Sequence, residues 1–209
     1  MEKYISDDVN ISIIPAIAVV SNSAPSAQSG VVFVLPSSID DIVMAWTSCG
    51  KRSPAGVGTC VAIPSAVTPI IAIGAPLNDG NGNNSGHVRI YKNENGSWNQ
   101  IGDDIDGKDP NDQSGYSVGL SGDGQIVAIG SPEAKNNEDL ITGLVRIYKN
   151  DNGKWNQIGL DINGEALNDG FGWSVTLSND GSVVAIGAPF NDGNGGYNNG
   201  HVRIYKNEN

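Results

Sequence analysis

The segment Ile71-Ala-Ile-Gly-Ala-Pro76 returns twice along the chain, as Val127-Ala-Ile-Gly-Ser-Pro132 and as Val184-Ala-Ile-Gly-Ala-Pro189. A second segment, Val-Arg-Ile-Tyr-Lys, follows each of these copies and recurs every 57 residues. A fixed period of this length is typical of architectures in which one supersecondary unit stacks on the next. Residues 70–209 are therefore predicted to form a tandem repeat.

Each repeat reads as four short strands, and the second copy contains all of them. An alternating segment at residues 115–121 opens the unit, and the almost wholly apolar segment 125–130 follows it. Such an apolar run suits an inner strand that is buried on both faces. In the third segment, residues 145–149, the period of two places Val and Ile on one face and Arg and Tyr on the other. The segment Trp-Asn-Gln-Ile-Gly at residues 155–159 completes the unit.

Turns that contain glycine separate these strands. Gly122-Asp-Gly124 and Asn179-Asp-Gly181 stand between the first and second strands. An Asp-Gly pair there predicts a hairpin with a type I′ turn, in which both central residues have positive φ. Asn-Gly pairs within residues 93–96 and 151–153 predict hairpins between the third and fourth strands. No helical period competes in this region, so the predicted class is all-β.

Tandem four-stranded antiparallel units indicate the blades of a β-propeller. The third copy has only reached Val-Arg-Ile-Tyr-Lys at residues 202–206, so residues 70–209 hold about two and a half blades of about 57 residues, a partial or incomplete propeller. Residues 1–69 show no clean copy and are predicted to be a divergent segment, β-rich or partly disordered. The chain is predicted to be a piece of a larger propeller. Two alternatives stay open: oligomerisation that completes the ring, or a missing strand and a divergent blade supplied by residues 1–69.

Short tags in the repeat resemble a known family. Phe171-Gly172 followed by Gly187-Ala188-Pro189 is similar to the FG-GAP repeat, the blade of integrin-α-type propellers. The resemblance implies a propeller, usually extracellular, that binds proteins or matrix and does not catalyse. The family often carries a calcium cage between its first two strands, but here that stretch keeps a single carboxylate, Asp123 or Asp180. Calcium needs six to eight oxygen ligands, several from carboxylates, so this cage is predicted to be absent.

The loops after the Gly-Ala-Pro strands are the best remaining candidates for a metal. Asp79, Asn81 and Asn83 alternate as the first ligands of a calcium loop would, and Asp192 and Asn194 occupy a similar loop in the third copy. No acidic residue closes either loop. Asn, Asp and Gly also gather in loops because they tolerate positive φ, and the prediction favours this second explanation.

Aromatic residues recur once per repeat at Trp98, Trp155, Tyr116 and Trp173. Aromatic rings stack on sugars in propeller lectins, which resemble this arrangement. More often an aromatic residue that recurs in each blade fills the gap between blades. Packing is the favoured interpretation, and glycan binding is the alternative.

An acidic cluster, Asp103-Asp-Ile-Asp106 with Asp109, follows Trp98. Paired carboxylates can serve acid/base catalysis, but no nucleophile accompanies them at a fixed spacing, so a solvated turn is expected. His87 and His201 share one repeat position with Leu144, which indicates packing at that position. The chain is therefore predicted not to be an enzyme.

Charge limits the possible partners. The net charge is −11, with nine basic and eighteen acidic side chains in residues 70–209. Nucleic-acid binding needs clustered Lys and Arg, and anionic lipid repels an acidic surface. The predicted partner is a protein or matrix component, with a glycan as the alternative.

The N-terminal region leaves several questions open. An apolar run at residues 11–20 is too short to span a membrane. Acidic residues precede it and Pro15 interrupts it, so a strand or unstructured lead is favoured over a signal peptide. Cys49 and Cys60 could close a short loop in an oxidising compartment or stay as separate thiols. The expected location is extracellular or at the cell surface.

Overall fold

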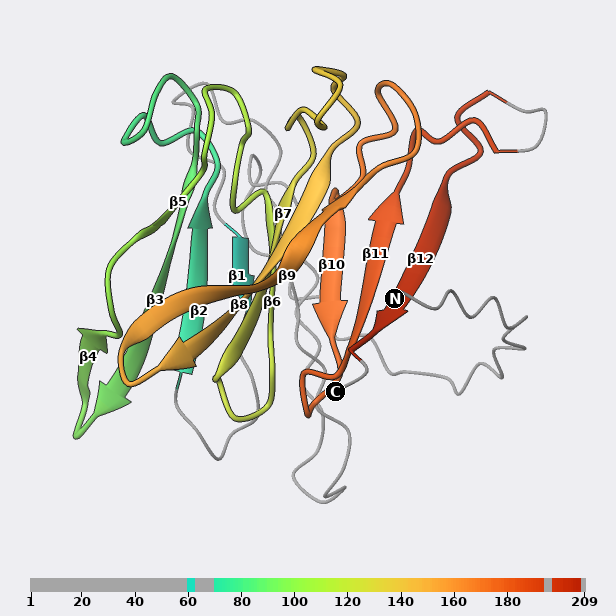
Figure 1. Ribbon diagram of the computed structural model, residues 1–209. Helices are drawn as coiled ribbons and strands as arrows, with labels where there is room; N and C mark the ends of the chain where they lie inside the picture. The colour runs from blue at the N-terminus through green and yellow to red at the C-terminus, as the bar shows by residue number, and fades with distance from the viewer. Residues whose placement is uncertain (1–59, 63–69, 194–196, 208–209) are drawn as a thin grey trace, which may run out of the picture.

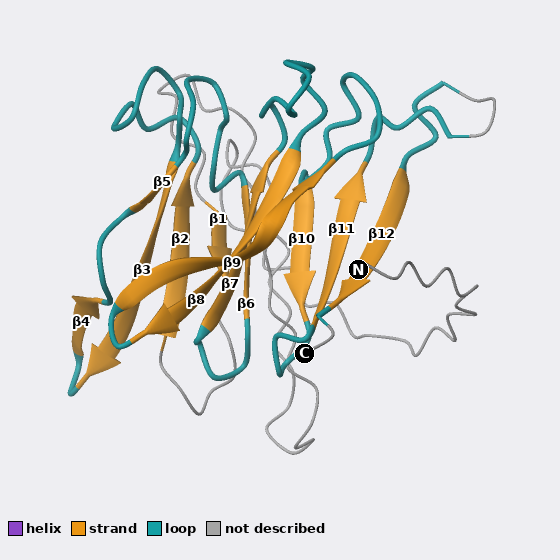
Figure 2. Cartoon of the chain, viewed as in Figure 1, coloured by secondary structure: helices purple, strands orange, loops and turns teal. Residues whose placement is uncertain are grey.

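The computed structural model describes residues 60–62, 70–193 and 197–207, and this part of the chain consists of strands joined by turns. Three antiparallel sheets stand side by side in the order of the sequence (Figures 1 and 2). The predicted all-β class is confirmed. Within these residues no helix has the length and apolarity needed to cross a membrane.

The strand order within the sheets follows the sequence. The first sheet contains β1 (Cys60–Ala62), β2 (Ile70–Ala75), β3 (His87–Glu94) and β4 (Ser97–Gln100), with β5 (Ile105–Asp106) also paired to β3. The second sheet contains β6 (Ser117–Leu120), β7 (Ile126–Ser131), β8 (Leu144–Asp151) and β9 (Lys154–Asn163). The third contains β10 (Ser174–Leu177), β11 (Val183–Ala188) and β12 (His201–Lys206). The second sheet thus has the four antiparallel strands predicted for one repeat.

The first sheet begins before residue 70. Cys60 in β1 pairs with Gly74, just as Ser117 pairs with Gly130 in the second sheet. Residues 60–62 therefore supply the first strand of the first sheet. Cys49 and the apolar run at residues 11–20 lie outside the described residues.

The two kinds of hairpin use different turns. Asn95 and Gly96 have φ values of 54° and 88°, so the β3–β4 hairpin has positive φ at both central residues, as a type I′ turn requires. The type I′ prediction for the turn at Asp123 is wrong, because Gly124 alone has positive φ there. The Gly124 N–H donates to Ser121 O, and the Ser121 hydroxyl donates to the Asp123 carboxylate. This short side-chain network shapes a longer turn than the Asp-Gly pair indicated.

Two apolar layers, one between each pair of neighbouring sheets, form the core. The first layer joins sheets one and two, and its buried members are Ile70, Ala72, Val88, Ile90, Ile105, Val118, Leu120, Val127 and Ile129. The second joins sheets two and three, with Ala128, Val145, Phe171, Val175, Val184, Ile186 and Ala188. The predicted two faces of the third strand are confirmed, since Val88 and Ile90 enter the first layer and Arg89 and Tyr91 do not.

Glycines allow the backbones of neighbouring sheets to approach closely. A Cβ added to Gly74 would lie 2.0 Å from Gly115 O, and one added to Gly130 would lie 2.1 Å from Gly172 O. No real Cβ occupies such a position, so these glycines are needed for the sheets to pack against each other.

Burial along the second strand reflects the position of each sheet. In β7 five of six residues are buried, because the second sheet has a neighbour on each side. In β2 and β11 buried and half-buried residues alternate. On the far face of the third sheet Val202 and Ile204 are exposed.

Candidate functional site

The longest loops of the described chain gather at one end of the three sheets, at the top of Figures 1 and 2. We call this end the loop face and define it as residues 76–86, 107–116, 132–143, 164–173, 189–193 and 197–200. Every Gly-Ala-Pro or Gly-Ser-Pro strand runs toward it, so the repeat places corresponding loops beside one another. Loops held on a rigid scaffold are where binding residues are most often found.

The first predicted calcium loop lies on this face, and its polar side chains already have hydrogen-bond partners. Asp79 Oδ1 accepts the backbone N–H of Asn84 at 2.8 Å. Asn81 Nδ2 donates to the carbonyl oxygens of Gly107 and Lys108, at 2.9 and 3.1 Å. These bonds close the loop on itself and fasten it to the next connection, which is the turn function that Asn and Asp commonly serve.

The second predicted calcium loop repeats part of this arrangement. Asp192 Oδ1 accepts the backbone N–H of Asn198 at 3.0 Å, as Asp79 does in the first copy. The side chain of Asn83 is exposed, and Asn194 lies outside the described residues. Calcium binding at these loops stays a prediction.

The four recurring aromatic residues separate into two pairs. Trp98 and Trp155 lie on β4 and β9, away from the loop face. Trp155 packs on the first apolar layer, and its Nε1 donates to Ile101 O at 2.8 Å, so it fills space between sheets. Tyr116 and Trp173 come together on the loop face, with ring centroids 4.7 Å apart. The structure therefore does not gather all four into one site.

Trp173 is the centre of an aromatic cluster that spans the second and third sheets. On its other side it meets Phe190 edge to face, with centroids 5.0 Å apart. Trp173 and Phe190 line an open cleft of about 260 Å³, which we call the aromatic cleft. Its lining is Pro132, Glu133, Ile141, Asn168, Gly170, Trp173, Phe190 and Asn198.

Backbone hydrogen bonds fix the three loops that form the cleft. The N–H of Asn168 donates to Ile141 O, and the N–H of Phe190 donates to Asp169 O at 3.2 Å. Beneath them the buried Asp169 carboxylate accepts Asn191 Nδ2 at 2.8 Å. A buried hydrogen bond of this kind holds the loops in one arrangement, so the cleft is formed before any ligand arrives.

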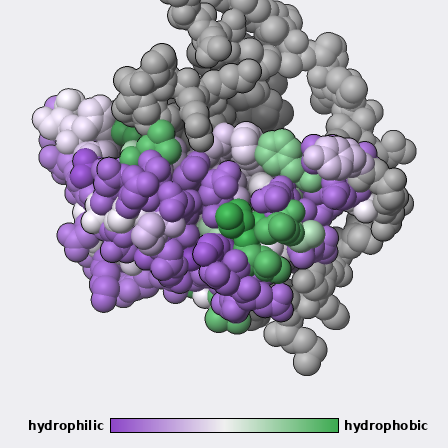
Figure 3. Space-filling view, turned by 90° about the horizontal axis from the view of Figure 1, so that it is seen from above, coloured by the Kyte–Doolittle hydropathy of each residue, from purple (hydrophilic) through white to green (hydrophobic). Residues whose placement is uncertain are grey.

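Apolar side chains surround the cleft. Leu140 and Leu167 are exposed and adjoin the lining residues Ile141 and Asn168 in the sequence. Phe190 is exposed and lines the cleft itself. Viewed from above, apolar surface in Figure 3 stands out on a face that is otherwise largely hydrophilic. Exposed apolar patches framed by polar residues commonly mark interaction sites.

The corresponding junction between the first and second sheets has different residues at its rim. At the repeat positions of Leu140, Ile141, Leu167 and Phe190 stand Asn83, Asn84, Pro110 and Glu133. The two junctions share a scaffold, because Asn111 N–H donates to Asn83 O much as Asn168 N–H donates to Ile141 O. The apolar rim of Leu140, Leu167 and Phe190 therefore belongs to one junction, although at two lining positions, those of Glu133 and Asn198, the first junction has the apolar Leu77 and Ile141.

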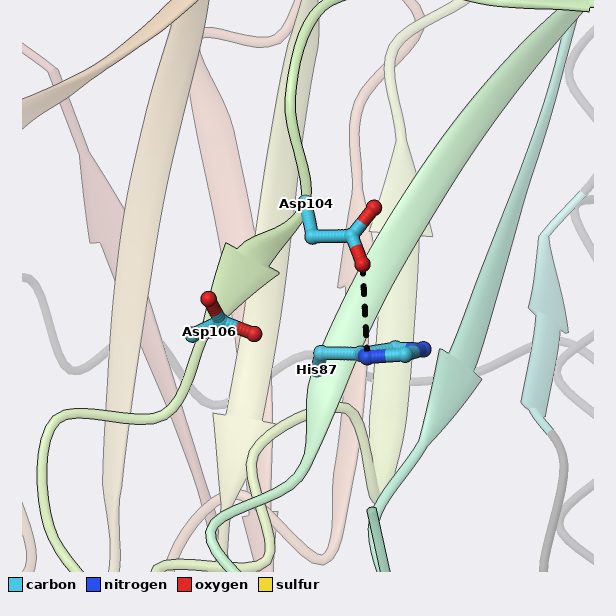
Figure 4. A group of neighbouring side chains, drawn as sticks. All are labelled: His87, Asp104 and Asp106. Carbon is cyan, nitrogen blue, oxygen red and sulfur yellow. Dashed lines mark ion pairs between the residues drawn. The ribbon is translucent and has the colours of Figure 1, made fainter. Parts of the chain in front are cut away.

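A second cluster on the first sheet combines His87, Asp104 and Asp106 (Figure 4). One ligand atom from each lies within 4.8 Å of the others, a spacing that could hold a metal ion. Asp104 is already taken, however: Arg89 donates to both of its oxygens, at 2.7 to 2.9 Å, and Gln100 donates at 2.8 Å. The guanidinium therefore already bonds both oxygens of this carboxylate and balances its charge.

The electrostatics of this cluster agree with the hydrogen bonds. The hydrogen bonds from Arg89 lower the pKa of Asp104 to about 2, and burial lowers the pKa of His87. Asp104 is therefore ionised and His87 is predominantly neutral near pH 7. The predicted solvated turn fits the exposed Asp103 and Asp109, but Asp104 is ion-paired and departs from it.

His87 is buried, as a packing residue should be, and the equivalent Leu144 is buried too. His201 is half-buried, and its Nε2 has no hydrogen-bond partner among the described residues.

The third sheet lies within a segment that matches a known family. Residues 163–205 match the FG-GAP repeat. The segment runs from the last residue of β9 to Tyr205 in β12 and contains Phe171-Gly172 and Gly187-Ala188-Pro189, so the resemblance is confirmed there. FG-GAP repeats occur in integrin-α-type propellers, generally as binding modules, and typically in extracellular proteins. No curated protein matches the chain.

Sequence reasoning found Trp173 in the aromatic cleft and Tyr116 beside it, but it missed Phe190 and the exposed leucines at the rim. Phe190, Leu140 and Leu167 do not recur in the earlier copy of the FG-GAP-like unit, and attention to recurring residues passed over them. The signal that could have identified them is the opposite one: apolar residues that replace polar ones in a loop whose other residues repeat.

Proposed function

We propose that this chain is a non-catalytic binding module, working outside the cell or at its surface, that holds a protein partner in the aromatic cleft. The observation that supports the proposal most directly is the exposed apolar rim around Trp173 and Phe190, on loops that hydrogen bonds hold in place. FG-GAP repeats generally serve in binding modules, which agrees with it.

The composition of the rim favours a protein over a sugar. Protein interfaces are enriched in aromatic residues and depleted of charge at their centre. Leu140 and Leu167 expose aliphatic side chains next to the cleft and offer no hydrogen bonds to a sugar hydroxyl. An aromatic or aliphatic side chain of a partner could enter the cleft that Trp173 and Phe190 line and be desolvated there.

Glycan binding is the second candidate, and one observation favours it. The cleft combines the Trp173 ring with the amides of Asn168 and Asn198 and the carboxylate of Glu133. A ring that stacks on a sugar, with polar groups that bond its hydroxyls, is a common combination in ligand sites.

A parallel selection separates the two candidates. The whole chain is immobilised and presented with a phage-displayed random peptide library and, separately, with a glycan array. We expect enriched peptides that carry an aromatic or aliphatic anchor and whose affinity falls about tenfold or more in Phe190→Ser and Leu167→Ser.

The junction between the first and second sheets provides the matched controls. Asn83→Ser and Pro110→Ser alter the positions equivalent to Leu140 and Leu167, and they should leave peptide binding unchanged. Binding to a glycan that Trp173→Ala removes, with no peptide enriched, would replace the first candidate by the second. Peptides that bind all of these variants equally well would show that the aromatic cleft is not the site.

A further inference from the structure

The third sheet carries an apolar face that nothing in the described residues covers. Val202 is 68% exposed and Ile204 is 49% exposed, because they point away from the second sheet on β12, the edge strand that pairs with β11. At the equivalent positions Val145 is 0% exposed, Ile90 is 1% exposed and Ile147 is partly buried, because a following sheet packs on each. The third sheet therefore presents the surface that the first two sheets bury against a neighbour.

Two smaller residues on the same face repeat this pattern. In the second sheet Gly130 lies against Gly172 of the next sheet, and the Ser117 hydroxyl donates to Gly172 O at 2.7 Å. Their equivalents are Gly187 and Ser174. A Cβ on Gly187 would meet only the Ser174 side chain of its own sheet, and Ser174 is exposed. The space that a following sheet occupies beside Gly130 is open beside Gly187.

The first sheet carries the complementary face. Along β2, Ile71 and Ile73 point away from the second sheet and are half-buried. The equivalent residues of the other two sheets are buried, because each packs on the sheet before it; they are Val127, Ile129, Val184 and Ile186. The first sheet thus has an open face of the kind that packs on a preceding sheet, which we call the receiving face. The third sheet has an open face of the kind that packs on a following sheet.

We infer that the uncovered face of the third sheet binds the first sheet of a second copy of this chain. The contact would continue the interface that the chain forms twice within itself, Val202 and Ile204 taking the place of Val88 and Ile90. Because the two faces differ, the contact is head to tail, and it closes only if the rotation returns to the first copy. Two copies of the three described sheets give six, within the range of about four to eight blades found in propellers.

Sedimentation velocity of the full chain over a wide concentration range tests the assembly. The wild type should form a discrete dimer. The dissociation constant of the dimer should rise about 30-fold or more in Val202→Glu, because the substitution places a charge at the centre of an apolar interface. Leu160→Glu is the control, because Leu160 is 82% exposed on β9 and lies on neither face. It should leave the dimer intact.

A mixing experiment tests the head-to-tail geometry. Ile73→Glu damages the receiving face and leaves Val202 and Ile204 intact, so this variant alone should also be a monomer. Mixed with Val202→Glu, it should form a one-to-one complex through the undamaged face of each partner. Circular dichroism and urea unfolding confirm that each variant is folded, and Ile71→Ser replaces Ile73→Glu if the latter is not.

Three results would overturn the inference. The wild type could remain monomeric at all concentrations. Val202→Glu could dimerise as well as the wild type. Ile73→Glu could dimerise as well as the wild type, which would indicate a face-to-face contact between the third sheets of two copies.

Discussion

The second sheet and the third sheet have nearly the same sequence but different surroundings. Both contain Val-Arg-Ile-Tyr-Lys on their third strand, and both have the Val-Ala-Ile-Gly segment on their second. Val145 is fully buried and Val202 is exposed, because the second sheet has a neighbour on each side and the third has one. The repeat therefore specifies the shape of one sheet, and the neighbouring sheet decides which of its residues are core.

The same comparison applies to charge. Arg146 in the second sheet is buried and reaches Asp112 and Asp161, at 3.4 and 3.0 Å. Its counterpart in the first sheet, Arg89, is partly exposed and pairs with Asp104 at 2.7 Å. The arginine at this repeat position is buried where the preceding sheet covers its face, and the following variants measure how much that cover matters.

The largest effect is expected at Arg146. Arg146→Ala removes the cation between two carboxylates and leaves Asp112 buried without its charged partner, so it should lower the free energy of unfolding by about 3–5 kcal/mol. Arg89→Ala, at the equivalent and more exposed position, should cost less than about 1 kcal/mol. Urea unfolding measures both. Similar losses for the two variants would mean that cover by a neighbouring sheet does not set the strength of these pairs.

Removing an isoleucine should reveal the same asymmetry in apolar packing. Ile90→Ala opens a cavity in the first apolar layer and should cost about 2–5 kcal/mol. Ile204→Ala, one of its two repeat equivalents, removes a half-exposed side chain and should cost less than about 1 kcal/mol in dilute protein. The urea midpoint is read at a concentration where the chain is monomeric. An equal loss for Ile204→Ala would show that its face is covered within one chain.

The close approach of glycines gives a third comparison. Gly130→Ala would push a Cβ into Gly172 O and should destabilise the fold by about 1–3 kcal/mol through overpacking. In Gly187→Ala the new methyl group meets only the Ser174 hydroxyl, which can rotate away, so the cost should be a few tenths of that. Thermal unfolding of the two variants and the wild type measures the loss of stability that each substitution causes. Equal destabilisation would place another backbone against Gly187 in the single chain.

Much of this fold could be predicted from the sequence, because the 57-residue period exposes the strand pattern three times. The all-β class, the strand order and the two faces of the third strand all follow from alternation and turn residues. The turn at Asp123 was predicted wrongly because Ser121 bonds to the Asp123 carboxylate and stabilises a different turn, a local competition that the Asp-Gly pair does not show.

The first strand of the first sheet was missed for a different reason. Gly58-Thr-Cys60-Val61 precedes Gly115-Tyr-Ser117-Val118 by 57 residues, but only its glycine and valine repeat. A strand that short carries too little pattern to be recognised without its partner. The pairing of Cys60 with Gly74 in the structure identifies this segment as the first strand of the sheet.

The candidate site was harder to predict than the fold. Spacing could identify Tyr116 and Trp173 as recurring, but it could not show that their rings meet while Trp155 packs between sheets. The apolar rim depends on which loops hydrogen bonds bring together, and those contacts join residues from different repeats. The acidic cluster likewise could not reveal that Arg89 occupies one of its carboxylates.

The smallest effect concerns pH. The contributions of Asp104 and Asp112 to stability should change in opposite directions as the pH falls. Arg89 lowers the folded pKa of Asp104 to about 2, so this carboxylate contributes stability above its unfolded pKa of about 4, and that stability is lost as the pH falls toward 2. Burial raises the pKa of Asp112, so its charge costs stability at neutral pH, and the cost is relieved as the pH falls through the raised value. Urea midpoints of Asp104→Asn and Asp112→Asn, each compared with the wild type between pH 7 and the acid limit of folding, test both signs. On acidification the advantage of the wild type over Asp104→Asn should shrink, and its stability relative to Asp112→Asn should rise. If both differences moved in the same direction, burial by the neighbouring sheet would not be what distinguishes the two carboxylates.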